Sequence, residues 1–120
     1  MNIEAAVIQA LGAALPVPAF ADVPKSRPAS FVTAERTGGT LANVAIDAAT
    51  VAVQSWAQGR YEASELAELV DAAMLAIPSG SGAITRCARN SGPYNFPDLD
   101  GGMGRYQAVY ELTFYKEVTQ

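Results

Sequence analysis

The chain has 120 residues, half of them hydrophobic, which fits one domain with a modest core and leaves little room for a second. Its formal net charge is −4 and its eight Lys and Arg residues are scattered, which argues against nucleic-acid recognition and against polybasic membrane binding. Histidine is absent and Cys87 is the only cysteine, so histidine-dependent catalysis, histidine zinc sites and internal disulfides are excluded. We therefore expect a protein without a cofactor, and not an enzyme.

The first predicted element is a helix that begins after Asn2, a good capping residue, and ends before Pro16. The apolar stretch 7–21 also looks like a secretory signal, but no Lys or Arg precedes Lys25, so we favour a structural helix. The segment 16–28 is rich in proline and is expected to be extended, with one short strand. Apolar residues recur every four positions on one face of the helix: Ile3, Val7, Leu11 and Leu15.

Two strands are predicted next, at 30–37 and 50–56, separated by a loop at 40–47. Gly38 and Gly39 are expected to turn the chain after the first strand, because glycine readily adopts positive φ. In the second strand Val51 and Val53 face one side of the sheet. The other side of this strand carries Thr50, Ala52, Gln54 and Trp56.

A second helix is predicted at 62–77, where Pro78 and the Gly/Ser run 79–82 are expected to end it. Glu62 lies favourably near the positive end of the helix dipole. The expected buried face consists of Leu66, Leu69, Val70, Ala73, Met74 and Ile77.

A strand at 83–90, a long loop at 91–104 and a last strand at 105–118 complete the chain. Both faces of the last strand carry aromatic or aliphatic residues, since Tyr106, Tyr110 and Phe114 alternate with residues that include Val109 and Tyr115. One face is expected to pack under the helices, and the other to meet another subunit or water. The order of helices and strands predicts a single α+β domain over 1–120. Its sheet is expected to be mostly antiparallel or mixed, with about four to five strands and two helices on one face.

Several short segments follow one another in a characteristic order. They are Pro-Val-Pro at 16–18, Val-Pro-Lys-Ser-Arg-Pro at 23–28, Phe-Val-Thr-Ala-Glu-Arg-Thr-Gly-Gly at 31–39, Ser-Trp-Ala at 55–57, the helix 62–77, Ser-Gly-Pro-Tyr at 91–94, Pro-Asp at 97–98 and Arg-Tyr-Gln at 105–107. Each is short, but their order over nearly the whole chain resembles the tail terminator proteins of siphophages, especially those of actinobacterial phages and prophages. Residues 40–47 depart from the resemblance, because they lack the polar turn composition of that family.

The resemblance implies a structural protein that assembles as a homohexameric ring on the head-proximal end of the finished tail tube. There it would stop tube polymerisation and offer a joining surface to the head. The implied partners are further copies of the chain, the tail tube protein and a head-completion or connector protein. The implied location is the neck end of the tail in the virion, after assembly in the host cytoplasm.

A ring of identical copies needs a head-to-tail contact between two different surfaces of the chain. The extended segments 16–28, 37–48 and 91–104 are suited to reach a neighbouring copy. The residues that we expect at a subunit or partner interface are Arg36, Gly38, Gly39, Trp56, Pro93, Tyr94, Arg105 and Tyr106.

Several of these features also have simpler interpretations. Trp56 fits a core position as well as an interface position, and Cys87 between Arg86 and Arg89 fits a half-buried structural cysteine better than a reactive thiol. The Asp98–Gly102 segment lacks the remaining ligands of a calcium loop and is expected to be a solvated turn. The segments Gly38-Gly39 and Gly80-Ser81-Gly82 lack the Lys-Ser/Thr ending of a phosphate loop and are expected to be turns.

Two alternatives to the tail terminator function remain open. One is another neck or head-closure protein of the virion. The other belongs to a different class, a small soluble α+β module that binds a ligand between sheet and helices. Stoichiometry discriminates between them, because a ring former makes higher oligomers and a ligand module stays a monomer or dimer.

Overall fold

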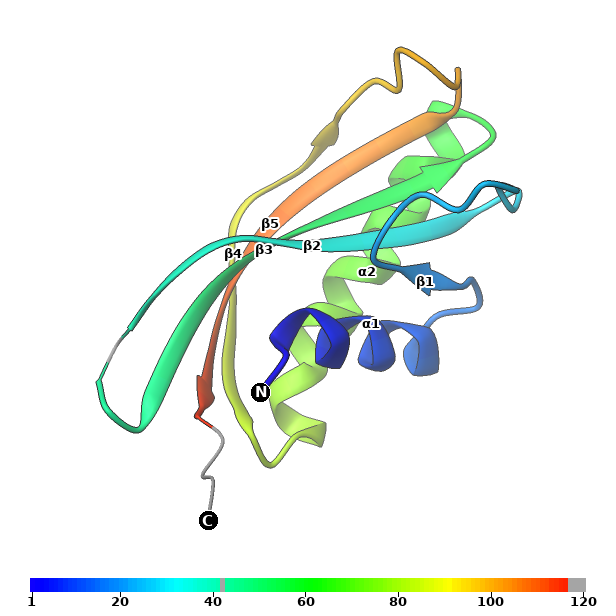
Figure 1. Cartoon of the computed structure of the whole chain (residues 1–120). Helices are drawn as coiled ribbons and strands as arrows, with labels where there is room; N and C mark the ends of the chain where they lie inside the picture. Colours follow the sequence, from blue (N-terminus) through cyan, green and yellow to red (C-terminus); the bar gives the residue numbers. More distant parts are fainter. Residues whose placement is uncertain (42, 117–120) are drawn as a thin grey trace.

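The structure is a computed structural model that describes residues 1–41 and 43–116. This part of the chain forms two helices and a five-stranded sheet of order β1-β2-β3-β5-β4, in which β1 is parallel to β2 and every other pair is antiparallel. The α+β prediction with a mixed sheet is confirmed (Figure 1). The elements are α1 (Ile3–Ala14), β1 (Ala19–Phe20), β2 (Phe31–Leu41), β3 (Ile46–Ala57), α2 (Arg60–Gly80), β4 (Ile84–Asn95) and β5 (Gly104–Tyr115).

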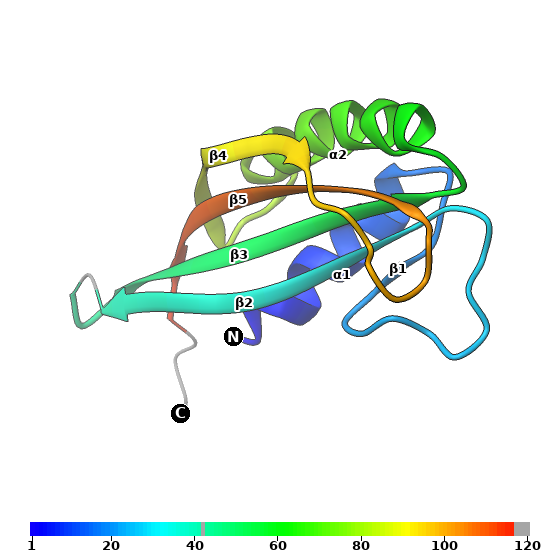
Figure 2. The same cartoon turned by 90° about the horizontal axis from the view of Figure 1, so that it is seen from above.

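Both helices cover the same face of the sheet, α2 along β4 and α1 behind β2 and β3 (Figure 2). The core lies between these layers because alternate residues of each strand point toward the helices. Val51 and Val53 of β3 share one side of the sheet, as predicted, and this side faces the core, together with the residues of β5 that pair with them. The strand side chains in the core include Val32, Ala34, Val51, Val53, Ala108, Tyr110, Leu112 and Phe114.

Helix α1 follows the sequence prediction closely. The Asn2 side chain accepts a hydrogen bond from the Ala5 N–H at 3.0 Å and so caps the first turn. Its predicted apolar stripe is buried at Ile3, Val7 and Leu11. The helix therefore supplies one of the two apolar surfaces that close the core.

Helix α2 differs from the prediction in its bounds and in one face residue. It begins at Arg60 and continues through Pro78 to Gly80, so proline does not end it. Pro78 lies in the last turn of the helix, with Ser79 and Gly80 after it. Leu69, predicted to be buried, is 51% exposed, because the buried stripe runs along Leu66, Val70 and Met74 on another side of the helix.

The β2–β3 hairpin is longer than predicted. Gly38 and Gly39 lie inside β2, paired with Thr50 and Ala49, so the predicted turn at these glycines is wrong. The pairing is irregular instead between Arg36 and Gly38, where a β-bulge shifts the register. The two ends of the predicted loop 40–47 belong to the strands, since β2 reaches Leu41 and β3 begins at Ile46. The hairpin projects well beyond the helices (Figure 1).

Strands β4 and β5 also extend further into the predicted loop 91–104. Strand β4 reaches Asn95 and β5 begins at Gly104, which leaves 96–103 as the connection. Pairing continues past Pro93 because register shifts on both sides of Ser91 absorb the irregular backbone. Strand β5 ends at Tyr115, and the rest of the predicted last strand at 117–118 lies outside the described residues.

Candidate functional site

The face of the sheet opposite the helices carries a row of stacked side chains across three strands. Phe31, Trp56 and Arg105 are direct cross-strand partners on β2, β3 and β5. The rings of Phe31 and Trp56 are stacked with centroids 5.3 Å apart, and the Arg105 guanidinium lies 4.6 Å from the Trp56 ring centroid. Stacking and cation–π attraction thus join the three strands on this side.

A second row, of polar side chains, runs beside the first. The Trp56 Nε1–H donates to Thr33 Oγ1 at 3.0 Å, and the amide of Gln54 donates to Gln107 Oε1 at 2.8 Å. Gln107 in turn donates to the Tyr94 hydroxyl of β4 at 2.8 Å. The network links four strands, and all buried polar side-chain atoms among the described residues have a hydrogen-bond partner.

Two loops cover the stacked row of Phe31, Trp56 and Arg105. Arg105 donates to the carbonyl oxygens of Phe96 and Pro97, at 2.7 and 2.8 Å. The Arg27 guanidinium lies 5.3 Å from the Trp56 ring centroid and pairs with the Asp98 carboxylate at 2.9 Å. Trp56 is therefore only 2% exposed within a single chain.

Asp98 organises the turn after β4. Its carboxylate accepts the N–H groups of Gly101 and Met103 as well as the Arg27 guanidinium. Burial alone would raise the pKa of this carboxyl, but these hydrogen bonds outweigh it and hold the pKa below its ordinary value. The turn was predicted correctly, although the Asp98 side chain is covered rather than solvated, being 5% exposed.

Three of the predicted interface residues, Trp56, Tyr94 and Arg105, belong to this cluster on the open face. Pro93 and Tyr106 are partly exposed, and Tyr106 lies on the helix side of β5, the side of Ala108 and Tyr110. Sequence reasoning missed Arg27, whose partner Asp98 is 71 residues away, and Phe96, which contacts Arg105 across the β4–β5 connection. Their aromatic and guanidinium character was the only available signal.

The other predicted interface residues lie far from this cluster, in the projecting part of β2. The backbone N–H of Arg36 donates to the Glu4 carboxylate at 2.8 Å, and Arg36 Nε donates to the Gly38 carbonyl oxygen at 3.2 Å. A Cβ on Gly39 would collide with the Ala48 carbonyl oxygen, whereas one on Gly38 would meet only Thr50, at 4.0 Å. The structure thus divides the predicted interface into two groups of residues.

A polar cluster between α2 and the sheet includes the single cysteine. Tyr110 donates to Asp71 at 2.8 Å, and Arg89 pairs with the same carboxylate at 2.9 Å. Burial, followed by the nearby Asp71 charge, raises the pKa of the Cys87 thiol to about 11. Burial and hydrogen bonding to Asp71 also raise the pKa of Tyr110. The predicted half-buried position of Cys87 is confirmed.

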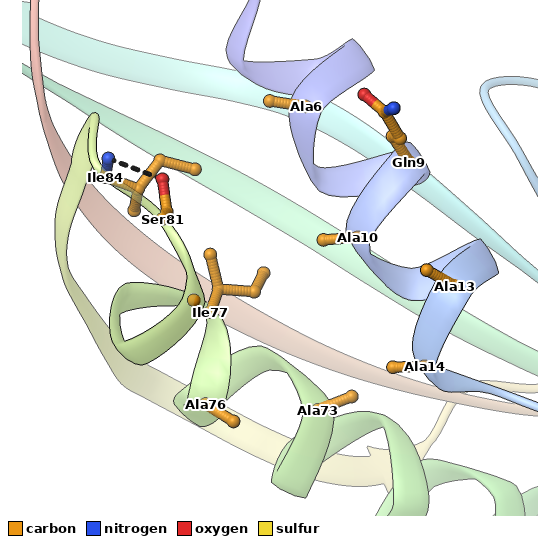
Figure 3. Close-up of a pocket in the computed structure, with 11 residues that line it drawn as sticks. Ala6, Gln9, Ala10, Ala13, Ala14, Ala73, Ala76, Ile77, Ser81 and Ile84 are labelled. Atoms are coloured by element: carbon orange, nitrogen blue, oxygen red, sulfur yellow. Dashed lines mark hydrogen bonds between the residues drawn. The ribbon is translucent and has the colours of Figure 1, made fainter.

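An apolar groove of about 440 Å³ lies between α1 and α2. Alanines of α1 face alanines of α2 across it (Figure 3). Ser81 and Ile84 line one end of the groove, and Ser81 Oγ accepts a hydrogen bond from the N–H of Ile84 at 2.9 Å. Gln9 is one of the few polar residues that line it. The groove offers shape but few polar groups that would orient a ligand.

Residues 1–41 and 43–116 contain no group of three or more acidic or cysteine side chains placed to hold a metal ion. Their helices are all too short or too polar to cross a membrane. What these residues do provide is two separated surfaces, the cluster on the open face and the projecting hairpin. No protein-family model matches the sequence, and no curated protein matches it.

Proposed function

We propose that this chain is a structural assembly protein that forms a hexameric ring on the head-proximal end of a siphophage tail tube. The ring ends polymerisation of the tube and offers the surface to which the head joins. The order of sequence segments supports this function, and the α+β fold is compatible with it.

The observation that carries the proposal is the projecting β2–β3 hairpin. Its β2 residues from 37 to 40 are all exposed, although the strand pairing continues along them. The molecule is accordingly elongated, measuring 46 × 25 × 25 Å along its principal axes. A monomer gains little buried area from such an arm, whereas in an oligomer the arm reaches a neighbouring copy.

A ring also needs a second, different surface that receives the arm, and a ring on a tube needs a third surface for its tube or head partner. The chain offers a candidate for this partner surface away from the hairpin tip. Tyr94, Phe96 and Leu99 near the β4–β5 connection are exposed, with Leu99 at 91%. Exposed aromatic and aliphatic residues on a rigid support are typical of interface anchors.

Electron microscopy of the concentrated, negatively stained protein tests the proposal. We expect ring-shaped particles whose class averages show six-fold symmetry around a central opening. Particles that are only single chains or closed two-fold dimers, at every concentration, would rule out a ring formed by the chain alone. When tail tubes are added, the rings are expected at one end of each tube.

The ligand-binding module is a second candidate, and the groove between α1 and α2 favours it. Its volume lies within the range of about 300 to 1,000 Å³ that small-molecule sites occupy. This function predicts a monomer or dimer that gains thermal stability from a small apolar compound. A hexamer that no such compound stabilises would exclude it.

A further inference from the structure

The sheet leaves two backbone edges open at the same end of the molecule. Strand β4 is the border strand on one side. On the other side β1 covers β2 only at Val32 and Thr33, and the Glu4 carboxylate accepts the N–H of Arg36. Beyond Arg36, no strand of the described chain pairs with the outer edge of β2.

The two open edges lie in the same rows of the sheet. Gly38 shares a row with Ala88, since Gly38 pairs with Thr50, Thr50 with Glu111, and Glu111 with Ala88. By the same pairing Gly39 shares a row with Cys87, and Thr40 with Arg86. Both stretches are regular, because the register shifts of β2 and β4 fall outside them.

The hydrogen-bonding groups of these edges also match. The N–H of Lys116, just after β5, donates to the Ala45 carbonyl oxygen. Because the direction of backbone bonding alternates along a strand, the even-numbered residues of β5 direct their N–H and C=O groups toward β3. Leu112 therefore bonds with Ala49, which belongs to the same row as Gly39 and Cys87. Because bonding alternates across an antiparallel sheet, Gly39 and Cys87 direct their N–H and C=O groups outward, at opposite edges.

The chain directions agree as well. Strands β2, β3, β5 and β4 are antiparallel in succession, so β4 runs opposite to β2. A second copy placed sideways across the sheet would bring its β2 antiparallel to β4 of the first. Within one chain Gly38 has room for a side chain, with Thr50 at 4.0 Å, so the fold of a single chain does not require glycine there.

We propose that copies of this chain join head to tail by edge pairing, with residues 38–40 of β2 in one copy adding to residues 86–88 of β4 in the next. Gly39 of one copy and Cys87 of its neighbour form the central pair and exchange two N–H···O bonds. This inference rests on the proposed ring and names the contact that builds it. The interface is heterologous, which is what a ring requires.

Disulfide cross-linking tests the pairing in a Cys87→Ala background. Thr40 and Arg86 would face each other as a non-bonded pair, with Cα atoms about 4.5 Å apart, a distance that a disulfide spans. Within one chain β3 and β5 separate the two residues by three strand spacings, roughly 14 Å, which is too far. Oxidation of Thr40→Cys/Arg86→Cys should therefore give a covalent ladder of copies on a non-reducing gel.

The matched control is Thr40→Cys/Ser91→Cys, because Ser91 is exposed on the same edge but four residues along β5 from the row of Thr40. A ladder that ends at six copies for the first pair and is absent for the control is the expected result. The absence of a ladder, or equal ladders, would overturn the edge pairing, and wild-type rings would then show that the ring has another contact. A ladder that continues past six copies would support the edge pairing but contradict the proposed hexameric ring.

Amide hydrogen exchange of the wild-type protein tests the same contact without any substitution. The N–H groups of Gly39 and Cys87 should exchange rapidly in dilute solution and at least about tenfold more slowly in concentrated solution. The N–H of Arg36, which the Glu4 carboxylate already accepts, serves as the internal control. Equal exchange of Gly39 and Cys87 at both concentrations would overturn the pairing, even if the cysteine variants failed to fold.

Discussion

Single side chains hold the open face of the sheet together. Trp56 lies between Phe31 and two guanidinium groups, and Arg105 ties this stack to the carbonyl oxygens of the β4–β5 connection. Asp98 does the same for Arg27, so two loops distant in sequence are joined by one ion pair. The cluster thus orders the surface around Tyr94 and Phe96 before any partner binds.

Asp98→Asn should destabilise the fold by about 1 kcal/mol at neutral pH, because the amide accepts fewer and weaker hydrogen bonds than the carboxylate. The folded pKa lies below the ordinary value of 3.8, so the contribution is complete above that value and is lost as the pH falls through the folded pKa. Urea unfolding of both proteins between neutral and acidic pH measures the difference. Asp100→Asn, on the exposed side of the same turn, is the control. A difference that grows on acidification would contradict this account.

The elements that the sequence predicts best are those whose side chains repeat with a clear period. The stripe of α1 and the alternation in β3 and β5 match the structure because burial on one face determines both. Gly38 and Gly39 were misleading, since glycine meets the demands of a turn and of a close backbone approach equally well. Pro78 was misleading because a proline marks only an approximate helix boundary, and the helix here continues for two residues after it.

The candidate site was only partly predictable, for a related reason. Trp56 and Arg105 could be chosen from the sequence as aromatic and cationic residues typical of interfaces. That they are cross-strand neighbours follows from the register between β3 and β5, strands that a helix and a third strand separate in sequence. Arg27 and Asp98 are 71 residues apart, and no local pattern predicts their contact.

Within the β2–β3 hairpin, the two adjacent glycines should respond differently to substitution. Gly39→Ala should lower stability by about 1 to 3 kcal/mol, because its Cβ would collide with the Ala48 carbonyl oxygen. Gly38→Ala should change stability by less than about 1 kcal/mol, since its Cβ meets only an ordinary contact. Thermal unfolding of both variants in dilute solution measures this. Equal losses would show that the hairpin packs differently from the described strands.

At the scale of the whole molecule, the features that a monomer does not need are the ones that an assembly uses. The hairpin extends beyond the helices, and both borders of the sheet stay open in matching rows at its end. Natural sheets usually protect long open edges, and in β4 irregular pairing lies on both sides of residues 86–88, with Pro93 further along the strand. The regular stretch 86–88 is where we propose that the next copy binds.

The central claim is that this chain assembles into a closed ring, and its mass in solution tests that claim most directly. Light scattering after size exclusion measures the molar mass over a wide range of protein concentration. The mass should rise with concentration and level off at that of six 12.5 kDa chains. A stable dimer that never grows, or a monomer even at the highest concentration, would contradict self-assembly through the two open edges.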